Sequence, residues 1–399
     1  MKHEQLNISG EKWLSDPDLL RLMELLNADG ENARIVGGAV RDALLCIYWK
    51  RKKKIGDIDI ASKLTPDENI QLLEKAGIKV IPTGVKYGTV TAVLNKKAYE
   101  ITTLRRDIET DGRHAQVVYT RDWSEDAERR DFTINALYLS IDGTVHDPLG
   151  GLKDLKEAKI RFIGNARDRI EEDALRILRF FRFSSNVEVG GIDETGLLAC
   201  VEQKHLIRKL SGERVWQEFE KILMSKKVMQ IIPVLEVVGL LREIVPNYKS
   251  YDGFLNYVKL EKKLKLKNPL GRLSCLLPNN EKIVKNAASD LKLSNFEKDR
   301  LIKYAADYEK HDLTSKSIRR VLYGYGKDVV IYNLIRRGVL DKKTLYYVND
   351  YTIPIFPIHG QDLLDNGWKA GKEMGAELKR LEQIWIDNDF NPIKTEPLH

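Results

Sequence analysis

Residues 34–45 read RIVGGAVRDALL, and GDIDIAS follows at 56–62. The apolar run that opens the first stretch predicts a strand, Gly37 and Gly38 end it, and the residues after them predict a helix. Glycines let the backbone approach a ligand closely, and a helix N-terminus offers N–H groups to phosphate oxygens. Arg41, one turn into the helix, adds a positive charge. The first stretch therefore predicts a phosphate-binding turn; the alternative for the glycine pair is a simple turn.

The second stretch predicts a strand that carries two acids. Successive side chains of a strand point to opposite faces, so Asp57 and Asp59 are expected on one face and Ile58 and Ile60 on the other. Two carboxylates on one side of a strand can hold two Mg²⁺ ions roughly 4 Å apart, which activate an attacking hydroxyl and stabilise the leaving oxygen of a phosphoryl transfer. The alternative is an exposed polar face. The phosphate-binding turn upstream favours the metal site.

Around these stretches the sequence predicts one compact α+β domain. Runs rich in β-branched residues predict strands at 88–94 and 99–104. The segment 136–147 predicts a hairpin with a type I′ turn at Asp142 and Gly143. Closely spaced strands joined by short links, with helices at either end, are typical of a mixed sheet covered by helices.

Beyond the DPLGG turn at 147–151, strand patterns nearly vanish and a helical spacing of apolar residues takes over. Helices are predicted at 211–223, 259–267, 313–326 and 363–386. Ser211 is expected to be the N-cap of the first, and the last can form one helix or two. The predicted architecture is a mixed-sheet head followed by a long helical arm.

Composition narrows the class of protein. The 399 residues carry a net charge of +7, and 43% of them are hydrophobic, which is typical of a globular chain of several modules. The basic excess favours a polyanionic partner such as nucleic acid. Cys46, Cys200 and Cys275 lie far apart and predict reduced thiols. With no apolar run near the ~20 residues of a membrane span and no signal-like N-terminus, a cytoplasmic protein is expected.

Together the two opening stretches resemble the DNA polymerase β-type nucleotidyltransferase superfamily. With EDAERRDFTINALYL at 125–139 and RIEEDALRILRFFRF at 169–183, they look like the class II CCA-adding enzymes of the tRNA nucleotidyltransferase/poly(A) polymerase family. Matching segments cover roughly the first half of the chain and include 83–93, 99–117 and 147–155. The resemblance implies a polymerase β-like head at 1–155, a helical neck at 156–225, a helical body at 226–310 and a helical, tRNA-binding tail at 311–399.

The resemblance also implies residue roles. Asp57 and Asp59 would bind Mg²⁺ and carry catalysis. Nucleotide contacts are implied for Gly37, Gly38, Arg41, Arg130, Asp173, Arg176, Arg179 and Arg182. Glu100 is either a third carboxylate near the metals or a solvent-facing strand residue.

The segment 169–183 can be read as a base-selecting helix. Asp173 and Arg176 are three residues apart and so are expected on one helix face. Cytosine and adenine both present an amino donor beside a ring acceptor, which suits an accepting Asp and a donating Arg. Uracil and guanine present the reverse order, and a buried mismatch costs about 1–3 kcal/mol per group. The alternative is a surface ion pair.

Arg179 and Arg182 continue this stripe. Guanidinium groups pair with phosphate oxygens in a fork, so an arginine row suits a triphosphate, although a solvated basic face is the alternative. The polar segment 107–117 predicts a mobile loop. In the family, a loop at this place is linked to the switch from C to A addition, and here it looks full length, which favours complete CCA addition. His311 and Asp312 look like a phosphohydrolase dipeptide without its further ligands, and a structural role is expected.

The expected reaction is template-independent addition of CCA, from CTP and ATP, to the 3′ end of tRNA, with release of pyrophosphate. Expected partners are these nucleotides and tRNA, the latter held at its acceptor end and elbow with basic segments 259–267 and 316–320 as candidate contacts. No membrane and no obligatory protein partner is expected. Alternatives are an enzyme that adds only the final A, a poly(A) polymerase, a non-catalytic RNA-binding protein and a transferase acting on a small molecule.

Overall fold

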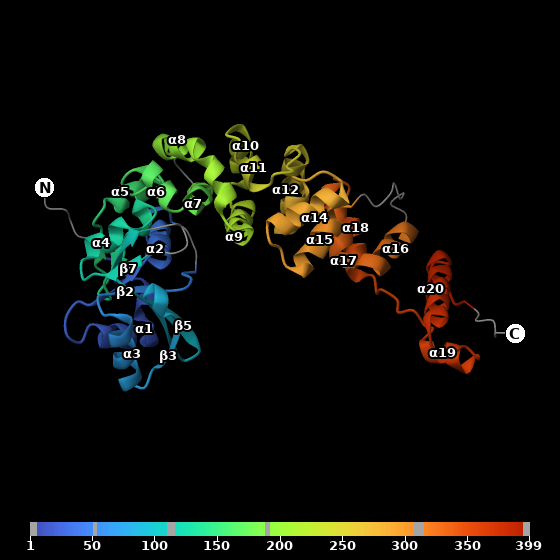
Figure 1. Cartoon of the computed structure of the whole chain (residues 1–399), viewed down its shortest axis with the longest axis horizontal. Coiled ribbons are helices and arrows are strands. Elements are labelled where there is room, and N and C mark those ends of the chain that lie inside the picture. The colour runs from blue at the N-terminus through green and yellow to red at the C-terminus, as the bar shows by residue number, and fades with distance from the viewer. Residues whose placement is uncertain (1–5, 51–53, 110–115, 188–191, 307–314, 394–399) are drawn as a thin grey trace. The chain divides into compact units, whose positions relative to one another are not determined.

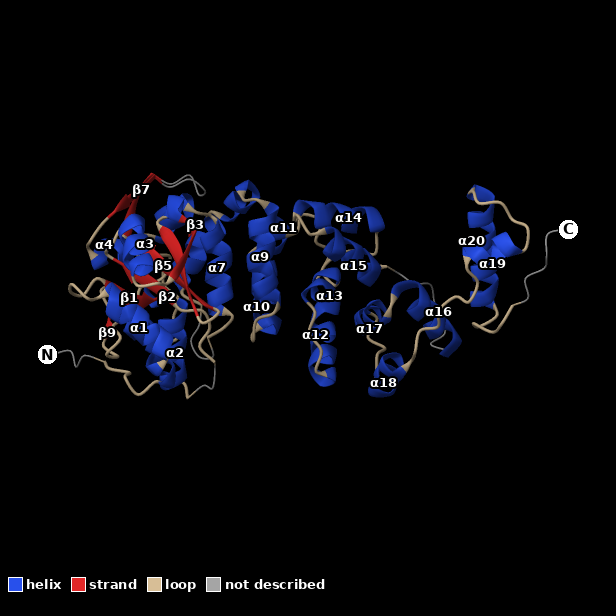
Figure 2. Ribbon diagram, turned by 90° about the horizontal axis from the view of Figure 1, so that it is seen from below, coloured by secondary structure: helices blue, strands red, loops and turns tan. Residues whose placement is uncertain are grey.

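The computed structural model describes residues 6–50, 54–109, 116–187, 192–306 and 315–393, with the backbone alone at 107–109, 116–117 and 315–316. The chain divides into two compact units, Met1–Ile244 and Val245–His399. The strands that the structure describes all belong to the first unit, and the described elements of the second unit are helices (Figure 2). The predicted α+β class, with a mixed-sheet head followed by helices, is confirmed.

A mixed sheet forms the centre of the first unit. In the described residues it has seven strands in the order β3-β4-β5-β2-β1-β8-β9. The strands are β1 (Ala33–Val36), β2 (Asp59–Ser62), β3 (Lys79–Gly84), β4 (Thr89–Leu94), β5 (Lys97–Thr103), β8 (Tyr138–Leu139) and β9 (Val145–His146). Strands β2 and β5 pair in parallel, and the other neighbours are antiparallel. A separate ribbon consists of β6 (Arg105–Glu109) and β7 (Gln116–Tyr119).

Helices cover this sheet and continue beyond it (Figure 1). The α-helices are α1 (Pro17–Leu26), α2 (Gly38–Tyr48), α3 (Pro66–Lys75), α4 (Trp123–Glu128), α5 (Gly151–Lys156), α6 (Ala166–Glu172), α7 (Leu175–Ser184), α8 (Glu194–Glu202), α9 (Gly212–Leu223), α10 (Val228–Val237) and α11 (Leu240–Ile244). Short 3₁₀ helices are η1 (Lys12–Ser15), η2 (Val85–Tyr87), η3 (Thr133–Asn135) and η4 (Lys204–Lys209).

The alternation of strand side chains decides which face carries the site. Val36 of β1 pairs with Asp59 of β2, so both point to one face. On that face Val36 and Ala61 pack in one buried cluster with Tyr138 of β8. Ile60 alternates with Asp59 and is fully buried on the opposite face. Asp59 therefore stands at the edge of an apolar core.

Two strand predictions need correction. Asp57 lies before β2, which begins at Asp59, because β1 pairs with it no further than Val36 and then turns away at Gly37. The hairpin of β8 and β9 is present, but its turn is not type I′. That turn needs positive φ at both central residues, and Asp142 has none.

The turn instead closes through the N–H of Gly143, which donates to the carbonyl of Ser140 at 3.0 Å, so Gly143 stands at the fourth position with a φ of 87°. The Asp142 carboxylate accepts from the N–H of Thr144 at 2.9 Å, which holds this shape. A local side-chain bond therefore overrides the Asp-Gly preference for the predicted turn.

Helix predictions are correct in place and inexact in detail. The predicted helix at 211–223 is α9, yet the hydroxyl of Ser211, its N-cap residue, makes no capping bond. The predicted helix at 169–183 is two helices, because Asp173 between α6 and α7 is extended, with φ −153° and ψ 103°. Asp173 and Arg176 are thus not neighbours on one helix.

The described part of the second unit consists of helices. These are α12 (Asp252–Leu264), α13 (Pro269–Ser274), α14 (Glu281–Asp290), α15 (Asn295–Ala305), α16 (Ser315–Tyr325), α17 (Lys327–Arg336), α18 (Lys342–Asp350), α19 (Gly360–Asp365) and α20 (Lys372–Asp387). The segment 363–386 therefore forms parts of two helices. Within the described chain no helix is long and apolar enough to span a membrane.

Two predictions fall on residues outside the described ranges. The predicted loop at 107–117 is described at its ends, where β6 reaches Glu109 and β7 begins at Gln116, whereas 110–115 lie outside the description. His311 and Asp312 also lie outside it.

Candidate active site

A cavity of about 470 Å³ opens beside β2, entirely within the first unit. Its lining residues are Gly37, Gly38, Arg41, Asp59, Arg129, Arg130, Asp131, Asn135, Asp173, Arg176, Arg179, Arg182 and Phe183. As far as the chain is described, six of these are arginines. The cavity brings together the predicted nucleotide contacts and one of the two predicted catalytic acids.

The turn between β1 and α2 forms one wall. Gly37 has φ 74° and ψ −128°, a backbone conformation that residues with a Cβ rarely adopt. A Cβ on Gly37 would lie 3.6 Å from Oδ2 of Asp59, so the glycine also keeps the backbone close to that carboxylate. Gly38 begins α2, whose first N–H groups have no acceptor within the helix. The predicted phosphate-binding turn therefore stands next to the acid.

Acids gather where β2 and β5 begin their pairing. Glu100 of β5 is exposed and pairs in register with Asp59, and this register places both side chains on one sheet face. Burial raises the pKa of Asp59, the charges of Glu100 and Asp57 add to the rise and the charge of Arg130 opposes it, and together they bring the pKa to about 6. Asp57 and Glu100 are thus near enough to act on Asp59, although neither lines the cavity.

This group of acids fits a divalent cation. Crowded carboxylates disfavour one another's charge, and a cation would offset that repulsion. Among the residues that the structure describes, no group of three or more His, Cys, Asp and Glu side chains forms a metal site by itself. Mg²⁺ is usually held by one or two carboxylates together with water and substrate phosphates, so a pair of acids beside a phosphate-binding turn suits it.

Three arginines of the cavity surround the ring of Phe183, which lines the same cavity. The guanidinium carbons of Arg41, Arg179 and Arg182 lie 4.8, 5.3 and 4.2 Å from the ring centroid. Burial lowers the pKa of Arg182, and the charges of Arg179 and Arg41 lower it further while Glu218 opposes them. A site in which positive charges crowd together favours an anion.

A chain of hydrogen bonds joins Arg179 of α7 to Arg41 of α2. The Asp131 carboxylate accepts from Nε of Arg179 at 2.7 Å and from the side-chain amide of Asn135 at 2.9 Å. The Asn135 oxygen in turn accepts from Nη1 of Arg41 at 2.7 Å. Asp131 is 8% exposed, so this chain is sheltered from water and sets the directions of both arginines.

The break between α6 and α7 places the predicted base-selecting pair. Oδ1 of Asp173 accepts from the N–H of Leu175 at 3.1 Å, and Oδ2 forms an ion pair with Arg214 of α9 at 2.8 Å. Arg176 pairs with Glu172 at 2.5 Å. The pair is therefore not a mutual surface ion pair, and each member is held by a different partner at the cavity wall.

Sequence reasoning missed four of the lining residues. Arg129 stands next to the predicted Arg130, while Asp131 and Asn135 lie in the same quoted segment. Phe183 is four residues after Arg179, a spacing that places two helix side chains side by side and could have found it.

Known proteins are similar to this chain along most of its length. A family model described as "Poly A polymerase head domain" matches residues 33–161, and one described as "Probable RNA and SrmB- binding site of polymerase A" matches residues 191–252. The protein "CCA tRNA nucleotidyltransferase 1, mitochondrial" of Danio rerio is 35% identical over an alignment of 407 positions that covers 99% of this chain and 92% of the relative. The Homo sapiens protein of that name is 34% identical over an alignment of 410 positions that covers 95% of this chain and 88% of the relative.

A solved structure supports the same assignment. The "Crystal structure of Bacillus stearothermophilus CCA-adding enzyme in complex with CTP" matches with a TM-score of 0.74 and 25% identity, covering 96% of this chain and 94% of that one. Because identity above 30% extends over nearly the full length of this chain and of the Danio rerio relative, the chain belongs to the family of CCA-adding tRNA nucleotidyltransferases.

Proposed function

We propose that this chain adds CCA, from CTP and ATP, to the 3′ end of tRNA, and that the arginine-lined cavity binds the incoming nucleotide. The observation that carries the proposal is the cavity itself, in which Asp59, the Gly37 turn and six arginines of the described residues meet. Membership of the CCA-adding family supports the substrates, because one relative is named a CCA tRNA nucleotidyltransferase and the similar solved structure is a CCA-adding enzyme in complex with CTP.

The metal in this proposal is Mg²⁺, held by Asp57 and Asp59 with Glu100 as a further carboxylate. Bound there, it would supply Lewis-acid stabilisation of the phosphate charge and a lowered pKa for the attacking hydroxyl. The rise in the pKa of Asp59 that burial and neighbouring acids cause supports a cation at this place. Loading with Mn²⁺ as well as Mg²⁺ tests which ion the site prefers.

The protein's own groups then bind and orient the nucleotide. Arg41, Arg179 and Arg182 point around Phe183 and would donate forked hydrogen bonds to the triphosphate. Their orientation is set before substrate arrives, which lowers the cost of reorganising the site as charge develops on the pyrophosphate. Gly37 and Gly38 would bring backbone N–H groups to the same phosphates.

Base selection in the proposal falls to Asp173 and Arg176. An accepting carboxylate and a donating guanidinium match the amino donor and ring acceptor of cytosine or adenine, while uracil and guanine would oppose like groups. Arg214 and Glu172 hold the two side chains from behind, which supports fixed directions for them. Their role as a protein template stays a proposal.

The second unit is proposed to bind tRNA through phosphate contacts, by shape rather than sequence. Lys259 and Lys263 of α12 are exposed and suit this role. In the other predicted segment Arg319 pairs with Asp389, so its guanidinium is already engaged. The finer division into neck, body and tail at residues 225 and 310 stays a prediction, as does a cytoplasmic location, which cell fractionation with a tagged chain would test.

An extension assay tests the function. A tRNA lacking its 3′ end is supplied with each nucleotide singly and with CTP and ATP together. Two CMP additions with CTP alone, then one AMP and a stop with both, are expected. A long A tract would point to a poly(A) polymerase, and AMP addition only to tRNA ending in CC would point to an A-adding enzyme; the names of the relatives favour neither.

A further inference from the structure

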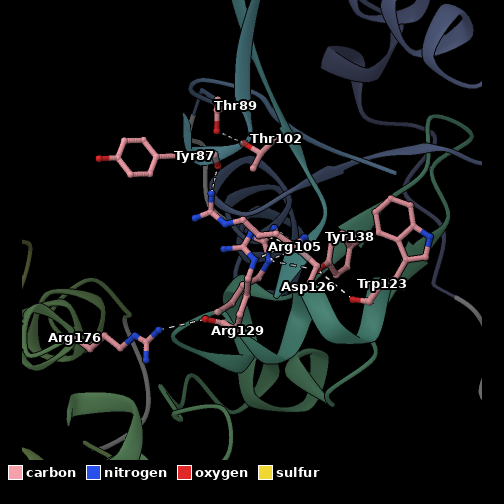
Figure 3. Close-up of polar contacts among 10 residues, drawn as sticks. Tyr87, Thr89, Thr102, Arg105, Trp123, Asp126, Arg129, Tyr138 and Arg176 are labelled. Carbon is pink, nitrogen blue, oxygen red and sulfur yellow. Dashed lines mark hydrogen bonds and ion pairs between the residues drawn. The ribbon is translucent and has the colours of Figure 1, made fainter. Parts of the chain in front are cut away.

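Asp126 is a buried acid that does not line the cavity but pairs with two arginines that do. It is 1% exposed and stands in α4. Nε and Nη2 of Arg129 lie 2.8 and 2.7 Å from its Oδ1, and Nη2 of Arg130 donates to its Oδ2 at 2.8 Å. The hydroxyl of Tyr138 donates to the same Oδ2 at 2.8 Å. Figure 3 shows Arg129 and Tyr138 beside Asp126.

The two arginines that Asp126 holds are both part of the cavity wall. Burial of Asp126 would raise its pKa, but the charges of Arg130 and Arg129 outweigh burial and hold the pKa below its usual range. Asp126 is therefore a buried carboxylate that compensates two charges on which the cavity depends. The charge of Arg130 also lowers the pKa of Asp59, so this arginine interacts with both acids.

The backbone of Arg129 and Arg130 also accepts hydrogen bonds from side chains of α6 and α7, the two helices that flank Asp173. The carbonyl of Arg129 accepts from Nη2 of Arg176 at 3.2 Å, and the carbonyl of Arg130 accepts from Nη2 of Arg169 at 2.8 Å. Figure 3 shows Arg176 reaching from its own helix to the Arg129 backbone. The position of Arg129 thus affects the direction of Arg176.

We propose, resting on the function proposed above, that Asp126 is a positioning residue for nucleotide binding and base choice. It orients Arg129 and Arg130 toward the triphosphate, and through the Arg129 backbone it aligns Arg176 with the base. Its removal leaves two arginines of the wall without their shared counter-charge, and they then turn toward Asp59 or solvent. Nucleotide affinity and discrimination against UTP both depend on it.

Three variants separate this role from general stability. Asp126→Asn keeps the shape of the side chain and removes its charge. Tyr138→Phe removes one donor to Asp126, and with it the acceptor of a 3.3 Å hydrogen bond from Nε of Arg130, while both arginines keep their ion pairs with Asp126. Asp154→Asn is the matched control, because Asp154 is also buried in the head, at 3% exposure, and pairs with an arginine, Arg161, that does not line the cavity.

The measurements are the KM and kcat for CTP and ATP on tRNA, the Kd for CTP by calorimetry without tRNA, and UMP incorporation relative to CMP. Loss of charge-assisted bonds costs about 1.5–3 kcal/mol, so roughly a ten- to hundredfold rise in KM and Kd is expected for Asp126→Asn. UMP incorporation relative to CMP rises at the same time. Tyr138→Phe shows a smaller rise in Kd, and Asp154→Asn keeps the wild-type KM, Kd and base choice.

The outcomes are separable. Wild-type chain that adds no CMP or AMP to tRNA overturns the proposed function, whatever the variants do. An active wild type with Asp126→Asn and Asp154→Asn equal in KM, Kd and base choice overturns the positioning role. If Asp126→Asn does not fold, Tyr138→Phe decides, and an unchanged Kd for CTP in that variant contradicts the proposal.

Discussion

The arginines of the cavity are each held by an acid. Because these partners lie mostly behind the wall, the guanidinium groups are fixed in direction while part of their donor set faces the cavity. The pairs are Arg41–Asp42, Arg129–Asp126, Arg130–Asp126, Arg176–Glu172, Arg179–Asp131 and Arg182–Glu218. Such an arrangement is preorganised for an anion, since little entropy remains to be lost when the ligand binds.

Asp59 gives the sharpest single-residue prediction. Asp59→Asn removes a charge from the proposed metal site, and a metal ion supplies several kcal/mol to phosphoryl transfer, so kcat should fall by roughly a hundredfold or more. Steady-state extension of tRNA measures it. Asp67→Asn, which changes an exposed acid of α3, is the control and should retain wild-type kcat. Full activity of Asp59→Asn would remove this residue from the chemistry.

Phe183 gives a second single-residue prediction. Phe183→Leu keeps an apolar side chain but removes the ring face that three arginines share, so these like charges separate and the anion site widens. Cation–π contacts are worth about 0.5–2 kcal/mol, so roughly a three- to thirtyfold rise in the Kd for CTP is expected. Phe181→Leu, a buried ring outside the lining, is the control. Equal CTP affinity in the two variants would contradict the role.

Among the elements, the turn from β1 into α2 is the most constrained. Gly37→Ala places a Cβ where φ is 74° and ψ −128°, which costs about 1–3 kcal/mol of backbone strain. Urea unfolding should report this loss of stability. Gly10→Ala is the control, because no atom lies within 4 Å of its added Cβ and its φ is not positive. The prediction fails if both variants unfold at the same urea concentration.

The joint between α6 and α7 shows how an element boundary sets function. Asp173 leaves the helical conformation, so its carboxylate can cap Leu175 and pair with Arg214 together. A continuous helix would have placed it beside Arg176 with both in a common stripe. The break separates the two side chains while keeping both on the cavity wall.

For the whole molecule, the two units divide the expected work. The cavity is complete within Met1–Ile244, so substitutions in the second unit should leave nucleotide affinity unchanged. Lys259→Glu with Lys263→Glu should raise the KM for tRNA roughly three- to tenfold at low salt and reduce the salt slope of binding by about one to two. Filter binding across a salt series measures it.

A charge-matched control for that variant lies in the head. Lys75→Glu with Lys79→Glu makes the same change in net charge on exposed residues of α3 and β3. If both double variants weaken tRNA binding equally, net charge rather than a surface of the second unit is responsible. An altered KM for CTP in the α12 variant would contradict the division of work.

Much of this protein could be read from local patterns. Val36 followed by Gly37 and Gly38 predicted the turn, because backbone freedom and apolar runs act over a few residues. The two acids of GDIDIAS were singled out from residue type and spacing, whereas the roles expected for the arginines of 169–183 came from the resemblance to the CCA-adding family. These features depend on neighbours in the chain, so a linear sequence contains them.

The arrangement of the site needed the folded chain. Arg41 and Asn135 are 94 positions apart, and Asp173 and Arg214 are 41 apart, yet each pair shares a hydrogen bond. Spacing even misled at Asp173, where an i, i+3 pattern hid a helix boundary. Which acid restrains which arginine follows from packing of strands and helices that are distant in sequence, and that packing is chosen by burial of the whole core rather than by any short segment.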